Sequence, residues 1–211
     1  KTRRAEQTGE GFDHDQFVAS HPSRPGRQFM LPAGTIHSSG RNQVVLEIGS
    51  LTVGSYTYKM YDYMRKDLEG KLRPIHTYHG DKVLRRDFKA AWVDKNLVQA
   101  PRTIREGDTW REIIVGEHDL LYFSLRNLVF EQRIEDDTCD RFHVLALVDG
   151  EKVLVRSLKD PSRFFEQRYL DIVVVPASFG PYEIINKGVG SVVMHKTMLK
   201  EGYEHDTAIR G

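Results

Sequence analysis

Apolar and polar residues alternate in short runs through the second half of the chain, and turn-forming residues separate the runs. A period of two is typical of β-strands that bury one face. This pattern predicts strands over residues 111–115, 120–131, 141–148, 151–157, 170–176, 182–186 and 190–197. Asp149-Gly150 lies between two of these runs and predicts a tight hairpin. Many short strands at close spacing favour a β-sandwich or barrel.

The first half of the chain is organised around residues 29–65, which combine turn residues with alternating runs. Pro32 and Gly34 predict a tight turn, because proline fixes φ and glycine lacks a Cβ atom. His37 follows this turn, on a short strand predicted over residues 35–37. Further strands are predicted over residues 44–48 and 56–63.

The remaining segments are predicted from helical spacing and turn residues. Apolar side chains recur at near-helical intervals over residues 83–98, and residues 99–107 are predicted to be a linker. His76 and His79 fall in a predicted loop between Pro74 and Gly80. We also expect a polar tail over residues 1–13, a short helix over 15–20 and a turn-rich connector over 21–27. The domains predicted are 1–28 (tail and connector), 29–107 (first β domain with helical linker) and 108–205 (second β domain).

Composition narrows the classes of partner. The chain has 31 basic and 30 acidic residues, so its charge does not favour nucleic acid or an anionic membrane as a partner. Its single cysteine, Cys139, cannot form an internal disulfide, which fits a reducing cytoplasm. No apolar run has membrane-spanning length. The acidic run 135–137 is predicted to be solvated surface. Because the chain starts at Lys1, we expect a fragment or trimmed form of a longer protein.

A short sequence pattern is weakly repeated in the two halves of the chain. The run from Pro32 to His37 precedes an apolar strand, and so does the run from Pro176 to Pro181, where proline stands at the histidine position. A duplicated β-barrel unit would explain this repeat, with the histidine, a candidate metal ligand, kept only in the first copy. Two unrelated turns are the alternative explanation, and the duplication is the favoured one.

The runs LPAGTIHSSGRNQVVLEI and SYTYKMYDYMR resemble the signature of class I, zinc-dependent mannose-6-phosphate isomerases, which are cupins. The resemblance is dense from Phe29 to Tyr63 and loose after Trp110. It implies a mostly β fold of two cupin-type barrels or jelly rolls joined by a short helical segment. The first barrel is either whole or cut short, and the second lacks metal ligands.

The resemblance also implies site residues. It makes His37 a ligand of Zn²⁺ and places Glu47 in the active site. Lys59 stands where the family has a catalytic arginine, which keeps the charge but loses the planar fork. The spacing between Glu47 and Lys59 is about two residues longer than in bacterial members, which points to a different loop at residues 52–54. Nothing before His37 matches the family's other zinc ligands.

The reaction implied is interconversion of mannose 6-phosphate and fructose 6-phosphate. It needs a base for proton transfer between C1 and C2, and zinc serves as a Lewis acid for the sugar oxygens. Lys59 would stabilise negative charge, and Arg41, Arg65 and Tyr58 are candidates for contacts to the sugar phosphate.

Each of these residues also has a structural interpretation. His37 can be a hydrogen-bonded turn residue, Glu47 and Lys59 can be solvated, and the tyrosines can be strand packing. A second hypothesis is therefore a non-catalytic cupin that binds a sugar or sugar phosphate. A third is another cupin enzyme, such as an epimerase or a metal-dependent oxygenase.

Overall fold

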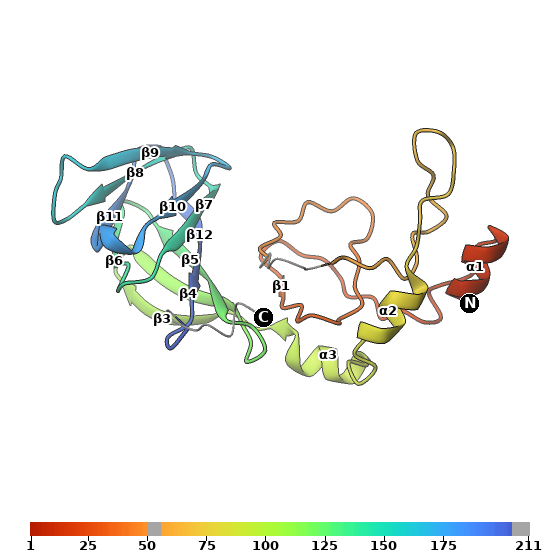
Figure 1. Ribbon diagram of the computed structural model, residues 1–211. Coiled ribbons are helices and arrows are strands. Elements are labelled where there is room, and N and C mark those ends of the chain that lie inside the picture. Colours follow the sequence, from red (N-terminus) through yellow and green to blue (C-terminus); the bar gives the residue numbers. More distant parts are fainter. Residues whose placement is uncertain (50–55, 204–211) are drawn as a thin grey trace. The chain divides into compact units, whose positions relative to one another are not determined.

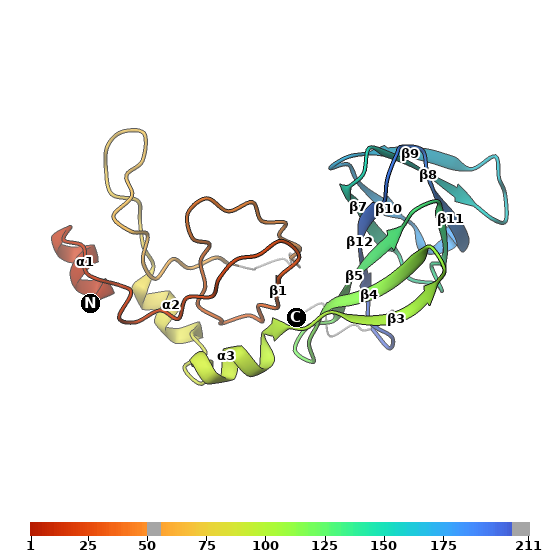
Figure 2. The same ribbon diagram turned by 180° about the vertical axis from the view of Figure 1, so that it is seen from behind.

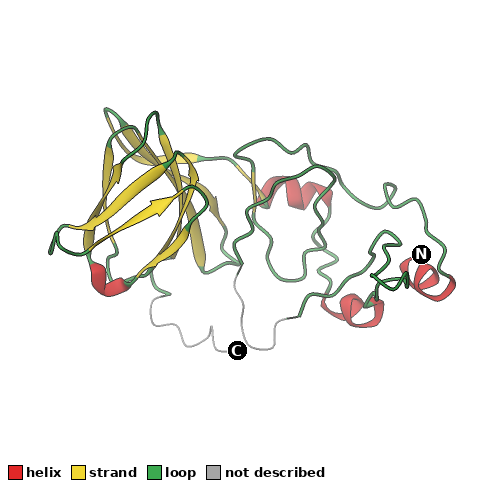
Figure 3. Cartoon of the chain, turned by 90° about the horizontal axis from the view of Figure 1, so that it is seen from above, coloured by secondary structure: helices red, strands yellow, loops and turns green. Residues whose placement is uncertain are grey.

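The alternation after residue 110 forms strands in the computed structural model, which describes residues 1–49 and 56–203. The chain divides into unit 1, Lys1–Arg27 with Leu31–Lys95, and unit 2, Gln28–Met30 with Asn96–Gly211. Figure 3 shows the strands gathered in unit 2, whereas most of unit 1 is loop. The strands of unit 2 are β1 (Gln28–Phe29), β2 (Val98–Gln99), β3 (Arg102–Gly107), β4 (Trp110–Glu117), β5 (Phe123–Phe130), β6 (Arg133–Asp137), β7 (His143–Asp149), β8 (Lys152–Ser157), β9 (Phe164–Arg168), β10 (Ile172–Val175), β11 (Pro181–Asn186) and β12 (Val192–Leu199).

Unit 2 is a jelly roll (Figure 1). One antiparallel sheet has the strand order β10-β7-β12-β5-β4-β3, and the facing sheet has the order β6-β11-β8-β9. From β5 to β8 the chain passes from one sheet to the other at every connection, and it does so again from β9 to β12. This strand order is that of the double Greek key. The predicted mostly β class and cupin-type jelly roll are thereby confirmed for this unit. A short additional pair, β1 with β2, lies outside these sheets.

The core of unit 2 lies between the facing sheets and explains the alternation (Figure 2). Inward side chains of both sheets are almost fully buried, among them Leu128, Phe130, Leu147, Val155, Ile184 and Met194. Their neighbours in sequence face outward and are more exposed, as the pattern on β12 shows. The hydrophobic effect on this one face therefore fixes the register of the strands.

The hairpin predicted at Asp149-Gly150 is wrong. The turn forms, with Gly150 at φ +108°, but β7 pairs with β10 and β12 while β8 pairs with β9 and β11. Both strands bury apolar side chains, and they face one another across the core instead of pairing edge to edge. The turn residues specified the reversal of the chain and not the pairing partner.

The predicted linker over residues 99–107 is also partly wrong, because residues 102–107 form β3. This edge strand pairs with β4 and is largely exposed, so it carries little hydrophobic signal. The strands β6 and β9 were missed for the same reason, since most of their residues are polar.

Unit 1 departs further from the prediction. Its helices are α1 (Thr2–Thr8), α2 (Thr77–Val83) and α3 (Ala90–Asn96), the last ending at the boundary with unit 2. The helix predicted over 83–98 is thus replaced by two shorter ones, and the tail contains a helix. Residues 15–17 form a turn instead of the predicted helix. Within the described part of the chain, residues 35–37, 44–48 and 56–63 form no strand, and the loop difference expected at 52–54 lies outside it.

The predicted strands of unit 1 do not form because few of its apolar side chains are buried. Ala5 and Pro32 are the buried apolar side chains in its described part, whereas Val44 and Val45 are exposed. A strand needs a partner for its backbone and a surface for its apolar face. Residues 44–48 have neither here. Among the described residues, no helix is long and apolar enough to cross a membrane.

Candidate functional site

The predicted turn before His37 is confirmed. Thr35 N–H donates to the Pro32 carbonyl oxygen over 3.1 Å, and the Thr35 hydroxyl donates to the same atom over 2.6 Å. Gly34 has φ +84°, and its carbonyl oxygen accepts a hydrogen bond of 3.0 Å from Arg85 N–H. The turn is therefore attached to the segment that follows α2.

Gly34→Ala is expected to loosen this turn. A Cβ atom would lie 2.6 Å from Cγ of Arg85 and 2.7 Å from the Val83 carbonyl oxygen, at a φ that disfavours side chains. We expect a loss of stability of more than about 1 kcal/mol. Limited proteolysis of unit 1 would show faster cleavage near residues 33–37 than in Gly40→Ala, whose Cβ would meet nothing within 4 Å. Equal cleavage of both variants would contradict the expectation.

His37 itself lies exposed beyond the turn. Its Nδ1 lies 2.8 Å from the Thr35 carbonyl oxygen and must carry a proton to donate there. In the neutral ring, Nε2 is then the unprotonated nitrogen, which is the form that binds a metal. Among residues 1–49 and 56–203, however, no three His, Cys, Asp or Glu side chains gather into a group that could hold a metal ion. The described donor set therefore does not fit zinc.

Lys59 belongs to a basic cluster around Asp62. Arg73 Nε lies 3.1 Å from Asp62 Oδ2, Lys59 Nζ lies 3.6 Å from the same oxygen, and Arg65 Nε lies 3.9 Å from Oδ1. Asp62 is mostly buried, and its single carboxylate faces three cations, so this group has a net charge of about +2. A pocket of about 180 Å³ adjoins it, lined in part by Glu6, Tyr61, Asp62, Arg65, Leu72 and Arg73. We refer to Lys59, Asp62, Arg65 and Arg73 as the basic cluster.

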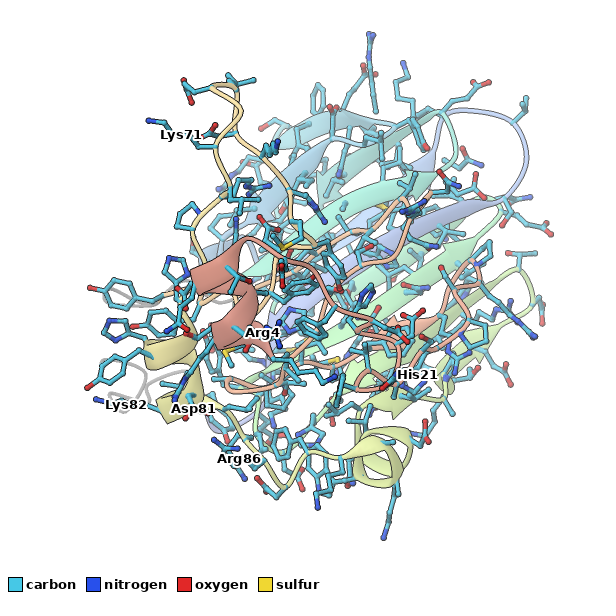
Figure 4. The ribbon with its side chains drawn as sticks, turned by 90° about the vertical axis from the view of Figure 1, so that its right-hand side faces the viewer. Arg4, His21, Lys71, Asp81, Lys82 and Arg86 are labelled. Carbon is cyan, nitrogen blue, oxygen red and sulfur yellow. The ribbon has the colours of Figure 1, made fainter. Side chains whose placement is uncertain are left out.

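Tyr58 lies beside the basic cluster in a stack of rings. It stacks on His79 with ring centroids 5.5 Å apart and on Tyr56 at 5.9 Å. His79 belongs to α2, whose Asp81 and Lys82 are labelled in Figure 4, so the predicted loop is wrong for His79; His76 precedes the helix as its N-cap residue. Lys59 N–H donates to His76 Nδ1 over 3.1 Å, which attaches the start of this helix to the segment 56–63.

The other predicted site residues are not brought together with the basic cluster. Arg41 and Glu47 are exposed in the unpaired segment that follows His37. Within the described residues, neither side chain has a hydrogen bond or ion pair to His37, Lys59 or Arg65. Their roles stay predictions.

A second group of ionisable residues, which was not predicted from the sequence, lies inside the jelly roll. Lys196 on β12 is 1% exposed, and its Nζ lies 2.7 Å from Glu112 Oε1 and 2.5 Å from Asp136 Oδ2. Arg126 Nη1 donates to Glu112 Oε1 over 3.0 Å. Arg105 bonds to Glu112 and lies 3.2 Å from Asp136 Oδ1. We refer to these five residues as the interior ion cluster.

Tyr182 and His143 extend the interior ion cluster. The Tyr182 hydroxyl donates to Asp136 Oδ2 over 3.2 Å and lies 2.8 Å from His143 Nδ1, which must therefore donate to it. Burial, together with the charge of Lys196, lowers the pKa of His143 to about 4. Burial acts to raise the pKa of Glu112, but the charge and hydrogen bond of Lys196 and the bond from Arg105 outweigh it and lower this pKa to about 2.

The interpretation of residues 135–137 as solvated surface is thus wrong for Asp136, whose side chain is 9% exposed. A signal was present in the sequence. Ile134 and Asp136 are two apart on β6, so they share the inward face, and Met194 and Lys196 do the same on β12. Charged residues in phase with core residues indicate a buried polar group.

Comparison with known proteins gives partial similarities. The chain is 40% identical to the mannose-6-phosphate isomerase ManA of Bacillus subtilis over 62 residues, 29% of this chain and 19% of that protein. It is 33% identical to the mannose-6-phosphate isomerase of Streptococcus mutans over 72 residues, 34% of this chain and 22% of that protein. The chain thus spans about a fifth of the length of these curated relatives. No protein-family profile matches it.

Among solved structures, the mannose 6-phosphate isomerase of Bacillus subtilis aligns with a TM-score of 0.49 and 16% identity. The alignment covers 65% of this chain and 39% of that structure. A cupin-2 domain protein from Shewanella frigidimarina aligns with a TM-score of 0.35 and 8% identity, over 45% of this chain and 85% of that structure.

Proposed function

We propose that this chain, a cupin of the class I mannose-6-phosphate isomerase type over part of its length, takes part in interconverting mannose 6-phosphate and fructose 6-phosphate. The observation that carries the proposal is the basic cluster beside the pocket of unit 1. A phosphate group carries nearly two negative charges at neutral pH, and guanidinium groups bind its oxygens well. Arg65 and Arg73, whose two positive charges exceed the single negative charge of Asp62 beside them, complement such a group and leave Lys59 for the sugar oxygens.

The chemistry assigns roles to the remaining residues. Isomerisation removes a proton from C2 of mannose 6-phosphate and returns one to C1, while a proton moves from O2 to O1. We assign the base to Glu47 and the stabilisation of the intermediate oxygen charge to Lys59. Tyr58, at the edge of its ring stack, would contact the sugar, and Arg41 would add a contact to the phosphate. No step is assigned to zinc, because the described residues hold no complete ligand set.

A coupled assay with mannose 6-phosphate tests the proposal. With metal supplied, we expect turnover by the parent chain and a loss of about a hundredfold in kcat/KM for Lys59→Ala. Lys59→Arg is expected to retain part of the activity, because the family has arginine at this position. Lys71→Ala, which makes the same charge change on an exposed loop (Figure 4), should stay within about twofold. Full activity of Lys59→Ala would contradict the assignment.

Elemental analysis of the same preparations tests whether His37 is a zinc ligand. If His37 binds zinc, the parent chain contains stoichiometric zinc and His37→Ala contains none. Zinc that persists in His37→Ala would remove the ligand assignment without affecting the test of Lys59.

The second candidate is a module that binds a sugar phosphate without turnover. The lack of a metal-binding group among the described residues favours it. A rise in melting temperature with mannose 6-phosphate, without turnover in the coupled assay, would support this function. No shift with either sugar phosphate would remove it.

A further inference from the structure

The edge strands of the jelly roll differ in charge. The six-stranded sheet ends at β10 and β3, and the four-stranded sheet ends at β6 and β9. The strands β3, β6 and β9 each carry at least two charged residues, which hinder pairing with the strand of another chain. The sequence of β10 is Ile-Val-Val-Val, and its register with β7 has no bulge. Among the strands that the structure describes, β10 is therefore the sheet edge without a protecting charge.

The free side of β10 presents unpaired backbone groups. The Asp171 carbonyl oxygen, just before the strand, accepts a hydrogen bond of 3.3 Å from Leu147 N–H on β7. Backbone groups alternate in direction along an antiparallel pair, so Val173 also bonds to β7, whereas Ile172 and Val174 point their N–H and C=O groups away from it. The described part of the chain supplies no backbone partner on that side. A row of this kind is a template for a further strand.

Exposed apolar side chains accompany these backbone groups. Ile172 and Val174 are 60% and 62% exposed, and Tyr169 and Leu170, in the turn just before β10, are 56% and 64% exposed. Together these side chains expose roughly 500 Å² of surface, whereas a standard stable interface buries about 800 Å² on each partner. The surface is therefore large enough for a dimer that dissociates at micromolar concentrations.

We propose that the jelly roll forms a two-fold symmetric dimer in which β10 pairs antiparallel with β10 of a second copy. A two-fold axis beside Val173 places Ile172 of each copy opposite Val174 of the other. Residues that are opposite in an antiparallel pair share a face of the sheet, so these exposed side chains cover one another. The backbone groups that point away from β7 then bond between the copies.

A second copy is the partner that this strand itself specifies. Antiparallel pairing of one uncharged strand with its own copy is self-complementary, and a two-fold interface is closed, so it stops at two chains. The register also keeps like charges apart, because Asp171 of each copy lies opposite Val175 of the other. Like charges directly opposite one another would destabilise the pair.

Sedimentation velocity of the parent chain tests the dimer. Between about 1 and 100 μM, we expect the mass to rise from that of one chain to that of two. Val174→Lys adds a charge of the kind that protects other edges, and should raise the dissociation constant at least about tenfold. Val189→Lys is the matched control, since this valine is 81% exposed in the connection before β12, and it should stay within about twofold. A parent chain that stays monomeric, or equal effects of the two lysine variants, would overturn the proposal.

The register is tested by cysteine cross-linking in a Cys139→Ser background, which also decides the question if Val174→Lys does not fold. Chains with Ile172→Cys are mixed with chains with Val174→Cys and oxidised with oxidised glutathione. We expect a disulfide-linked dimer of the two kinds of chain, because opposite Cα atoms lie within bridging distance. Either variant alone should form few such dimers, since its two cysteines are diagonal neighbours with Cα atoms about 7–8 Å apart. No cross-link in the mixture, or equal cross-linking of a single variant, would overturn the proposal. None of these outcomes depends on isomerase activity.

Discussion

Replacing Glu112 with glutamine is expected to lower the free energy of unfolding of the jelly roll by about 3 to 5 kcal/mol. The Glu112 carboxylate is 2% exposed and contacts Lys196, Arg105 and Arg126. The substitution keeps the size of the side chain but removes the negative charge that these three cations share. Asp136 alone then compensates them, and a charge left buried without a partner costs far more than the pair contributes.

Urea unfolding followed by far-ultraviolet circular dichroism measures this loss. Glu106→Gln is the matched control, since it makes the same change on the exposed edge strand β3. We expect the control to stay within about 0.5 kcal/mol of the parent chain. A loss below about 1 kcal/mol for Glu112→Gln would mean that water or structural rearrangement compensates the cations, and that the cluster is less isolated than its burial indicates.

The sequence predicted the strands of unit 2 where burial alternates cleanly. The run 190–197 corresponds to β12, because Val192, Met194 and Lys196 all face inward. It failed at β3 and β6, whose residues are mostly polar and whose pairing depends on β4 and β11. It also failed to pair β7 with its true neighbours. The alternation of apolar and polar residues predicts which face of each strand is buried. Which strands pair with one another depends on the packing of the whole sheet.

The interior ion cluster was not predicted, because a run of charged residues ordinarily indicates exposure. Asp136 lies between two other acidic residues, and a run of this kind is usually solvated. Only the phase of the strand separates it from Glu135 and Asp137. Lys196, which compensates Asp136, is 60 positions away in the chain, so no local pattern could reveal the pair.

In the candidate site of unit 1, the local turn was predictable from the sequence, but the strands and the grouping of side chains were not. The turn at Gly34 was predictable, because it depends on the conformational freedom of a few adjacent residues. The strands expected at 44–48 and 56–63 were not formed, because alternation supplies a face to bury but no surface to bury it against. Arg73 joined Lys59 and Arg65 around Asp62 only through the fold, since nothing in its own neighbourhood in sequence indicates a role.

Lowering the pH from 6.5 to 4 is expected to destabilise the jelly roll through His143, by up to about 3 kcal/mol. The groups that face this ring are Tyr182 on β11, Asp136 on β6, Lys196 on β12, Glu112 on β4 and Arg141. Burial and the charge of Lys196 hold the pKa of His143 at about 4, below the usual 6.5. Between pH 6.5 and pH 4, His143 is protonated in the unfolded chain and neutral in the folded chain. The free energy of unfolding therefore decreases as the pH is lowered from 6.5 to 4, and His143 causes no further decrease below pH 4.

Glu112 adds a second window at lower pH, which allows the two groups to be separated. Its folded pKa is about 2, below the ordinary 4.5, so its contribution is complete above pH 4.5 and is lost as the pH falls toward 2. Urea unfolding of the parent chain and of His143→Gln between pH 7 and pH 4 makes the test. The glutamine variant should have a flatter profile from pH 6.5 to 5, where Glu112 does not yet titrate. Parallel profiles over that range would mean that His143 can be protonated in the folded jelly roll, and that the interior near Asp136 admits a second cation beside Lys196.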